Sequence, residues 1–572
     1  MKLNKFFIAG GILAASLSLG SCVGDLDLMP TNPNDITSGS FSENPEQYMR
    51  EVLADVYLNV STFGPNGDNI LGSMDGGMST FQRAIFNLEE VPSDEANWQP
   101  TADAIPHNLT YGIVAANETF ILGSYQRMMV ESSLCNQFIQ TDFHLENAEQ
   151  EQLREEFVRQ VKILRSGMYF YLVSEFGNVP YNDENVMIGD VAPQLSSDFN
   201  TGRRMVTENV VNTLEEIVSW YKENDPNNNP PYGYVGLDVA EALLVKFYLN
   251  YEVFTGTPAW DKCFSHAQAL IKRRQGSGFQ NSGLAQNYAQ CFSYNNRTAA
   301  VDEIIWRIPQ VTAADNTENN PNGVINGTGN VGVQSWANGG FMINGFIGDT
   351  TDDSPFQCHQ ADYNSANGWK CMSARRQFVE VFDWDADYAV SPDQRTKWWK
   401  TAADGFNINN DDLTQPAWGT NGFLPVKFTN WYIENDGSVN RAMSPAAVDP
   451  LGIDYGMIRL AEIYLSAAEA ALHGGGSTAD ALTYVNYVRE RAGMPAYTSI
   501  NLTELQNERQ RELYTECTRR TDLIRYGKWI SGYNWNWKHQ AKEGADFSSN
   551  FIVYPLPANV VTINGYVQNP GY

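Results

Sequence analysis

The stretch EQLREEFVRQVKILRSGMYFYLVSEF, residues 151–176, decides the fold class of this chain. Its apolar side chains recur at steps of three or four residues, which is the periodicity of one buried helical face. Gly177 and Pro180 follow the run and are typical of a helix end. The segment therefore predicts a long amphipathic helix with the apolar positions Leu153, Phe157, Val161, Leu164, Met168 and Leu172.

Similar helical patterns occur on both sides of this stretch. Asn44, Pro45 and Gln47 have the spacing of an N-cap, a first helical position and an N3 position. Apolar periodicity also predicts helices that begin near residue 238, span 261–273 and resume after 455. Gly474 to Gly476 predicts a turn, and a further helix begins near Leu502 with Thr503 and Gln506 as its capping box. The fold class is thus mostly α.

Residues 276–454 have a different composition. Clusters of Gly, Asn, Asp, Thr and Pro interrupt the chain every few residues, which predicts irregular loops with short strands. Eight of the 14 Trp fall in this segment, so it forms either a core or a binding face. We interpret the chain as a helical scaffold, 41–275 and 455–572, around a loop-rich insertion.

The N-terminus has the features of an export signal. Lys2 and Lys5 precede an apolar stretch at 6–19 that is shorter than the ~20 residues of a membrane-spanning helix. Leu19-Gly20-Ser21-Cys22 resembles a lipobox, which implies cleavage before Cys22 and attachment of lipid to its sulfur. Residues 1–22 are then the signal with its lipobox, and 23–40 form a tether to the outer membrane. An ordinary secretory signal is the alternative.

Charge and cysteine content narrow the function classes. The chain has 38 Lys and Arg against 67 Asp and Glu, a net charge of -29. This acidity argues against nucleic acid and polyanionic ligands, although Arg375-Arg376 could form a local basic cluster. Cys135, Cys263 and Cys517 fall in helical segments and are best interpreted as core residues. Cys358 and Cys371 lie in the loop-rich region and could pair outside the cytoplasm.

Four segments together resemble the SusD/RagB family of surface lipoproteins. They are FVRQVKILRSGMYFYLVSEFGNVPY at 157–181, RLAEIYLSAAEAALHGG at 459–475, ALTYVNYVRERAGMP at 481–495 and NERQRELYTECTRRTDLIRYGKW at 507–529. The ending FIVYPLPANVVTINGYVQNPGY is similar to the closing pattern of the family. Two positions depart from the pattern: Cys517 stands where Gly is common, and Thr521 replaces an aromatic residue.

The resemblance implies a scaffold of TPR-like helix pairs built from both ends of the chain. It also implies a surface-exposed protein that captures oligosaccharides and delivers them to a SusC-like TonB-dependent outer-membrane transporter. The charged residues at 508–525 lie at helical spacings that allow repeated ion pairs, so we interpret them as structural rather than catalytic.

A sugar site needs flat aromatic rings for stacking and fixed polar groups for the hydroxyls. Trp98 lies in a polar loop without apolar periodicity, which predicts an accessible indole, although a core position is the alternative. The resemblance agrees, because some starch-binding members place a stacking Trp in this loop. Asp75 and Arg83, in a Gly-rich stretch nearby, could bind the hydroxyls.

The insertion offers further candidates. Trp336 lies in a glycine-rich setting unsuited to a core, and Tyr363 and Trp369 flank amide residues that include Asn364. By contrast, Trp384, Trp398 and Trp399 have apolar or helix-like neighbours, which favours core packing.

No cofactor is implied by the sequence. Asp349, Asp352 and Asp353 could bind a structural calcium ion, but the EF-hand pattern is absent and a solvated acidic loop is favoured. The sequence contains no GxSxG, HExxH, Walker or dinucleotide motif. We expect a glycan-binding protein that is not an enzyme. Two alternatives remain: a peptide-capturing lipoprotein of the RagB type, and a glycoside hydrolase, which needs only two suitably spaced carboxylates.

Overall fold

The computed structural model describes residues 44–61, 79–100, 104–186, 190–310, 360–365, 368, 371–409, 422–445 and 453–572. The chain divides into a small unit, Met1–Leu53 with Thr141–Glu156, and a large unit, Ala54–Gln140 with Phe157–Tyr572. The signal segment with Cys22 and the tether lie outside the described residues. None of the helices in the described ranges combines the length and the apolar character needed to cross a membrane.

The described part of the small unit contains the first turns of α3 (Pro45–Ser61) and α7 (Ala148–Glu175). The predicted cap of α3 is confirmed, because the Gln47 N–H donates to Asn44 Oδ1 at 3.2 Å and Pro45 takes the first helical position. The rings of Tyr48 and Phe143 pack edge to face in this unit.

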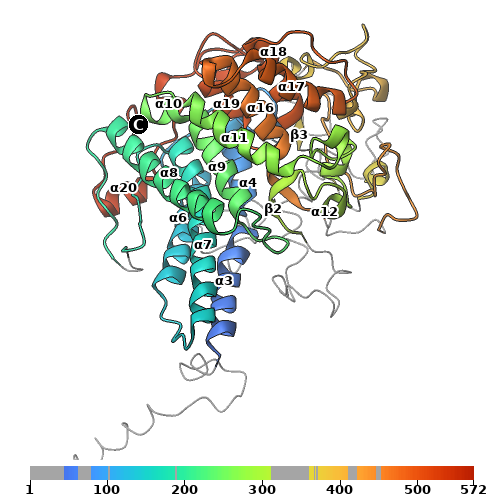
Figure 1. Ribbon diagram of the computed structural model, residues 1–572. Helices are drawn as coiled ribbons and strands as arrows, with labels where there is room; N and C mark the ends of the chain where they lie inside the picture. The colour runs from blue at the N-terminus through green and yellow to red at the C-terminus, as the bar shows by residue number, and fades with distance from the viewer. Residues whose placement is uncertain are drawn as a thin grey trace, which may run out of the picture. The chain divides into compact units, whose positions relative to one another are not determined.

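Helices from both ends of the chain make up the scaffold of the large unit. Helix α8 (Phe199–Asn224) packs on α9 (Leu237–Leu249), α9 on α11 (Trp260–Arg274), and α11 on α16 (Leu460–Ala470). Helix α16 then contacts α17 (Thr478–Arg491) and α18 (Leu502–Leu513). Figure 1 shows this array as green helices beside orange ones. The mostly α fold class predicted from the sequence is confirmed.

The remaining helices are shorter or flank this array. The α-helices are α4 (Phe81–Glu89), α5 (Ala104–Thr110), α6 (Thr119–Gln140), α10 (Tyr251–Thr255), α12 (Asn296–Ala299), α15 (Arg376–Val379), α19 (Arg519–Arg525) and α20 (Ala558–Asn564). Single turns of tighter or wider helix are η2 (Phe279–Asn281), η3 (Tyr288–Phe292), η5 (Gln360–Tyr363), η6 (Gln394–Thr396), η7 (Ala402–Asp404), η8 (Ala471–Gly475), η9 (Lys538–Gln540) and η10 (Ser549–Ile552).

Several predicted helix ends are found in the structure, and one cap differs. Gly474 adopts a φ of 97°, which suits the predicted turn before α17. Helix α18 begins at Leu502 as expected, but its N-cap is Asn501, whose side chain accepts the Glu504 N–H at 3.0 Å. The proposed box of Thr503 and Gln506 was therefore placed two residues too late. Asn is as good an N-cap as Thr, so the pattern alone did not decide between them.

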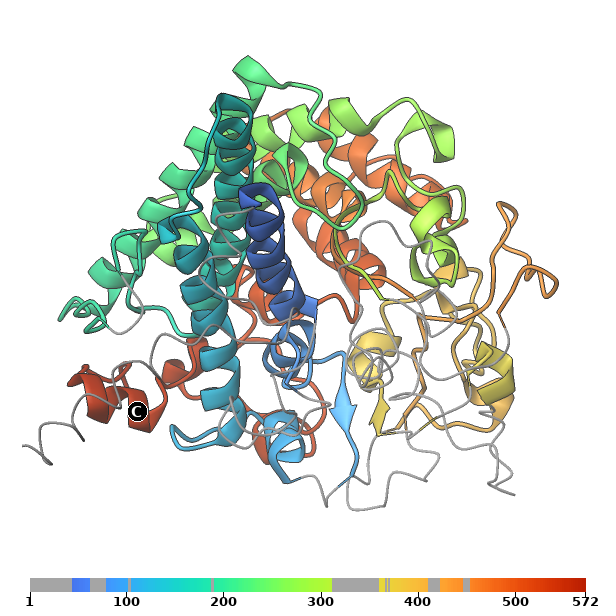
Figure 2. The same cartoon turned by 90° about the horizontal axis from the view of Figure 1, so that it is seen from below.

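Two short antiparallel sheets join distant segments. Strand β1 (Asn97–Trp98) pairs with β3 (Met372–Ser373), with Trp98 opposite Met372. Strand β2 (Ile304–Ile308) pairs with β4 (Tyr455–Arg459), from Ile304 opposite Arg459 to Ile308 opposite Tyr455. Figure 2 shows β1 in light blue beside the yellow β3. The second pair holds together the two ends of the loop-rich segment.

Gly167 sets the distance between α7 and strand β2. A methyl group at this position would lie 2.7 Å from the outer edge of the Trp306 ring. Glycine in a helix interior costs ~1 kcal/mol relative to alanine. The close approach of a buried indole explains why a glycine stands here, between Ser166 and Met168 on the buried part of α7.

Buried ion pairs connect the elements of the C-terminal scaffold. Arg459 on β4 is fully buried and pairs with Glu303 at 2.5 Å, Glu512 at 3.1 Å and Glu516 at 2.6 Å. Arg491 on α17 pairs with Glu303 at 2.7 Å and Glu512 at 2.6 Å. The structural interpretation of these charges is supported, with a difference: most partners lie on other elements rather than one helical turn away.

The two departures from the family pattern have local explanations. Cys517 has a φ of 59°, in the left-handed region that favours glycine, and it is buried, as are Cys135 and Cys263. Thr521 stands where the family commonly has an aromatic residue, and its hydroxyl donates a hydrogen bond to Glu89 Oε2 at 2.7 Å. The prediction that these three cysteines are core residues is confirmed, but Cys517 lies in the turn between α18 and α19 rather than in a helical segment.

Candidate functional site

Trp98 lies on strand β1, and its backbone is fixed on both sides. Its N–H donates to Thr110 Oγ1 at 2.9 Å, and its carbonyl oxygen lies 3.0 Å from His107 Nδ1. Its side chain is only 3% exposed. The expectation of an indole accessible to solvent is therefore wrong for this structure, and whether Trp98 contacts a ligand stays a prediction.

The predicted neighbour Arg83 is found beside Trp98. Its guanidinium lies 5.1 Å from the centre of the Trp98 ring and 5.5 Å from that of Phe86. Arg83 comes from α4, whose Thr80 cap accepts the Arg83 N–H. The structure thus brings together two of the three residues predicted for this site, as a buried cation–π pair. The third, Asp75, lies outside the described residues.

The polar loop before Trp98 is buried because its side chains bind the C-terminal scaffold. Asp94 is chelated by Arg519, with Nε to Oδ1 at 2.7 Å and Nη2 to Oδ2 at 2.8 Å, and it also accepts from Gln510 and Tyr533. Burial opposes ionisation, but the Arg519 charge and these hydrogen bonds lower the pKa of Asp94. A polar loop therefore need not be an exposed one.

Two glutamates of the same loop form a buried carboxyl pair. Burial raises the pKa of Glu90 to about 7, against the opposing effect of its hydrogen bond with Glu95. Burial and the neighbouring Glu90 charge raise the pKa of Glu95 well above its usual range. The backbone N–H groups of Thr518 and Thr515 donate to Glu90 and Glu95 respectively. The pair ties the loop to the segment between α18 and α19.

Tyr363 and Asn364 are buried and already hydrogen-bonded. The Tyr363 hydroxyl donates to the carbonyl oxygen of Trp398 at 2.8 Å, and its side chain is 1% exposed. The Asn364 amide donates to the carbonyl oxygens of Asn430 and Pro445, both at 3.0 Å. Their donors are thus used by the protein, which overturns the expectation that they project from a loop into a binding face. Trp336 and Trp369 lie outside the described residues.

Of the three Trp residues assigned to the core, Trp399 is buried as expected, whereas Trp384 and Trp398 are only half-buried. Trp399 is 5% exposed and packs against Phe378, Phe382 and Tyr514. Trp384 is half-buried and donates its indole N–H to the Val379 carbonyl at 2.8 Å. Trp398 is half-buried against a small core cluster formed by Ala289, Trp431 and Ile433.

Arg375 does not contribute to a basic binding cluster. Its guanidinium is buried and donates to the carbonyl oxygens of Ala96, Thr110 and Asn536. Burial lowers its pKa to about 10. Arg376 instead pairs with Glu380 at the surface. Both guanidiniums bond to other groups of the protein, so these two residues do not form a site for an anionic sugar.

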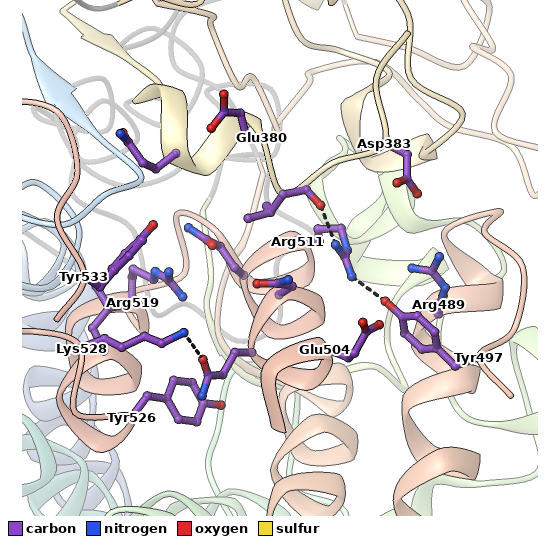
Figure 3. Close-up of a pocket in the computed structure, with 16 residues that line it drawn as sticks. Glu380, Asp383, Arg489, Tyr497, Glu504, Arg511, Arg519, Tyr526, Lys528 and Tyr533 are labelled. Atoms are coloured by element: carbon purple, nitrogen blue, oxygen red, sulfur yellow. Dashed lines mark hydrogen bonds between the residues drawn. The ribbon is translucent and has the colours of Figure 1, made fainter. Parts of the chain in front are cut away.

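A groove of about 510 Å³ lies on the C-terminal scaffold, and sequence reasoning did not find it. Helix α18 supplies several of its lining residues, and the others come from the α15 region, the end of α17, the loop that contains Tyr497, and the segment from α19 to Tyr533 (Figure 3). The periodic charges at 508–525 indicated ion pairs, which is correct, but gave no sign that part of this surface is hollow. Of the predicted site residues that the structure describes, Trp98, Arg83, Tyr363 and Asn364, none lines this groove.

Within the described ranges, no group of three or more His, Cys, Asp or Glu side chains is placed to hold a metal ion. Asp349, Asp352 and Asp353 lie outside those ranges, as does Cys358, while Cys371 is buried. Calcium binding and the Cys358–Cys371 disulfide stay predictions.

Comparison with known proteins gives one consistent result. Residues 302–572 match the model of the SusD family. The whole chain is 27% identical to the starch-binding protein SusD of Bacteroides thetaiotaomicron, over 99% of that protein.

Solved structures of SusD-like proteins have the same fold as this chain. A SusD-like protein from Bacteroides fragilis has a TM-score of 0.63 at 15% identity, covering 94% of this chain and 99% of that one. Surface glycan-binding protein A from Bacteroides thetaiotaomicron, in complex with laminarihexaose, has a TM-score of 0.58 at 18% identity, covering 91% and 99%. At these identities the structures establish the fold alone.

Proposed function

We propose that this chain, which belongs to the SusD/RagB family, is a glycan-binding lipoprotein of the cell surface. The observation that carries the proposal is the match, along the entire chain, to a protein described as starch-binding. The laminarihexaose complex of a relative with the same fold adds support for an oligosaccharide ligand. Peptide capture of the RagB type is less well supported, because the relatives named above are described by starch or glycan binding.

We further propose that the protein binds its glycan without cleaving it and passes it to a SusC-like TonB-dependent transporter. The lipid on Cys22 would hold it at the outer membrane, facing the exterior. No catalytic cofactor is needed for such a role. The fixed frame suits it, because rigid elements hold binding groups at lower entropic cost than loops do.

The ligand site in this proposal centres on the Trp98 and Arg83 pair. Asp75, Trp336 and Trp369 would complete it with a carboxylate and two indoles. Tyr363 and Asn364 would support the site from within, since their hydroxyl and amide donors bond to backbone carbonyls. Because Trp98 is only 3% exposed, a sugar could reach its ring only if neighbouring side chains move.

Affinity electrophoresis of the purified protein through gels that contain starch, laminarin or a uronic-acid polymer tests the proposal. We expect retardation by at least one neutral glycan and weaker, but not abolished, retardation in Trp336→Ala. The matched control is Trp260→Ala, a half-buried indole of α11 that stacks on His473 at 4.1 Å. Migration unchanged by every glycan would contradict the proposal, and release of reducing sugar by the pure protein would favour a hydrolase.

Trp98 needs a different substitution, because it is buried. Removing a buried Trp to alanine costs about 3–5 kcal/mol, so lost binding could reflect unfolding. Trp98→Phe keeps most of the packing and a stacking ring. We expect a Trp98→Phe protein that unfolds cooperatively and binds glycan more weakly than the native chain.

A further inference from the structure

The arginines that line the groove on α18 are already ion-paired within the protein. Arg489 and Arg511 both bond to Glu508 Oε2, at 3.1 and 2.8 Å, and Glu508 is fully buried. Although burial opposes its ionisation, the surrounding guanidiniums lower the pKa of Glu508 to about 2. Arg519 is chelated by Asp94 in the same way. Each of the three guanidiniums therefore has a carboxylate partner, with Glu508 shared by two of them, and each offers directional N–H donors.

The charges that remain do not favour an anion. Lys528 has a pKa lowered by burial and by Arg519, and its Nζ donates to Gln506 Oε1 at 2.5 Å. Asp383 and Glu504 are exposed carboxylates on the lining. A polyanion would meet these two acids, whereas an uncharged ligand meets no electrostatic penalty.

Three half-buried tyrosines are fixed around the groove. The Tyr533 hydroxyl donates to Asp94 at 2.7 Å, the Tyr526 hydroxyl donates to Glu469 at 2.6 Å, and the Tyr497 hydroxyl accepts from Arg511 at 2.8 Å. Figure 3 shows Tyr526 and Tyr533 at one end and Tyr497 at the other. Because the hydroxyls hold the rings in place, little conformational entropy is lost when a ligand packs on them.

Helix α18 presents polar groups that the protein itself does not use. The side chains of Glu504 and Asn507 line the groove three residues apart, on one helical face. No hydrogen bond joins either side chain to another group in the described ranges, and the Gln506 amide nitrogen likewise has none. A carboxylate and amides can accept from and donate to adjacent hydroxyls, which is what the rim of a pyranose ring requires.

We propose that this groove is a second oligosaccharide-binding site that takes a neutral glycan segment. Its volume of about 510 Å³ lies within the 300–1,000 Å³ typical of ligand pockets. Fixed aromatic rings, ion-paired guanidiniums and unengaged amide and carboxylate groups are together suited to polyhydroxyl chains. The inference rests on the proposed function, since it assigns a second place where the same class of ligand binds.

The test uses Glu504→Ala with Asn507→Ala, two truncations that remove no hydrogen bond described above. They are made in the native chain and in the Trp336→Ala chain, and each protein is titrated with maltohexaose and with laminarihexaose by calorimetry. The control is Thr503→Ala, which is exposed on the same helix and does not line the groove. We expect the binding that persists in Trp336→Ala to weaken about tenfold in the groove variant and to be unchanged in the control.

The outcomes separate the two proposals. Binding by the native chain together with equal affinities of the groove variant and the control overturns the second site and leaves the proposed function standing. Complete loss of binding in the Trp336→Ala single variant would likewise overturn the second site and leave the proposed function standing. Absence of binding in the native chain overturns both. Tighter binding of hexagalacturonate than of the neutral sugars, lost in the groove variant, would overturn the ligand class.

Discussion

At the scale of single residues, the buried charge of Arg459 should contribute strongly to the free energy of unfolding. It contacts three carboxylates, and both it and Glu303 are shielded from water. Removing one partner of a buried ion pair costs about 3–5 kcal/mol, because the charges left behind are uncompensated. We expect Arg459→Met to lower the free energy of unfolding by at least this range, measured by urea denaturation.

Arg376→Met is the matched control for that experiment. Arg376 pairs with Glu380 at 2.7 Å, but both side chains are about two-fifths exposed, 43% and 39%. Exposed pairs contribute about 0–1 kcal/mol. Similar losses of stability in the two variants would show that the buried network is not what holds these elements together.

The Glu90 carboxyl gives the protein a predictable dependence on pH. Its folded pKa of about 7 lies above the usual 4.5, so the folded state binds more protons than the unfolded state between these values. Stability should therefore fall as pH rises from 4.5 to 7. We expect Glu90→Gln to lose less stability than the native chain when thermal unfolding is compared at pH 5 and pH 8.

Glu216→Gln, at an exposed position of α8, serves as the control and should follow the native chain. Parallel pH profiles of the native chain and Glu90→Gln would refute the raised pKa of Glu90.

The stability of the protein also depends on pH in a second, more acidic range. The pKa of Glu303 is depressed to about 2 by Arg491 and Arg459 despite its burial, so its contribution is lost as pH falls from 4.5 toward 2.

At the scale of elements, the contact of α7 with β2 depends on the absence of one methyl group. Gly167→Ala would place a carbon 2.7 Å from the Trp306 ring. Overpacking of this kind costs about 1–3 kcal/mol, which exceeds the ~1 kcal/mol gained in helix propensity. We expect a net loss of stability in chemical denaturation, with an unchanged dependence on denaturant concentration.

A double-mutant cycle identifies the cause. Trp306→Phe removes the outer ring atoms that the new methyl group would meet, so Gly167→Ala should cost less in that background than in the native chain. Additive losses would mean that strain elsewhere in α7, not the contact with β2, explains the effect.

The helices were the most predictable elements, for a physical reason. Stripes of apolar residues such as Phe157 and Leu164 must face a core, and a glycine such as Gly177 or Gly474 ends the helix in a conformation that other residues avoid. The strands could not be placed in the same way. Each has two to five residues, and β1 pairs with β3 only because the fold brings residues 97–98 and 372–373 together.

The candidate site was predictable in part. Trp98 and Arg83 were expected in the same site and do lie together, but the burial of Trp98 was missed because the loop before it is polar. Its acids find their partners in the last seventy residues, with Asp94 bound to Arg519. Such long-range compensation leaves no local signal, and for the same reason the groove beside Arg519 could not be inferred from the sequence.

At the scale of the whole molecule, the proposed binding of neutral sugars by this strongly acidic chain should be insensitive to salt. Coulombic attraction to an ionic ligand weakens as the Debye length falls from about 10 Å at 0.1 M to 3 Å at 1 M. Stacking and hydrogen bonding to an uncharged glycan do not depend on this screening. We expect less than a twofold change in the dissociation constant for maltohexaose or laminarihexaose between 0.1 and 1 M sodium chloride.

Isothermal titration in the two salt concentrations checks this, with the urea unfolding midpoint of the same protein as the control for salt effects on folding. A tenfold or greater weakening at high salt would show that charge governs recognition. That result would favour a charged peptide or an anionic glycan as the ligand.

The pairing of β2 with β4 determines which part of this protein can vary in length. Ile308 and Tyr455 stand opposite each other, so the two ends of everything between them are clamped at neighbouring positions of the frame. A stretch anchored in this way can change in length at little extra cost in loop-closure entropy, as long as its own contacts with the frame, such as β3 with β1 and Trp399 with Tyr514, are kept. Evolution or protein engineering could thus vary the segment between Ile308 and Tyr455, and with it the ligand preference, while the helical scaffold stays the same.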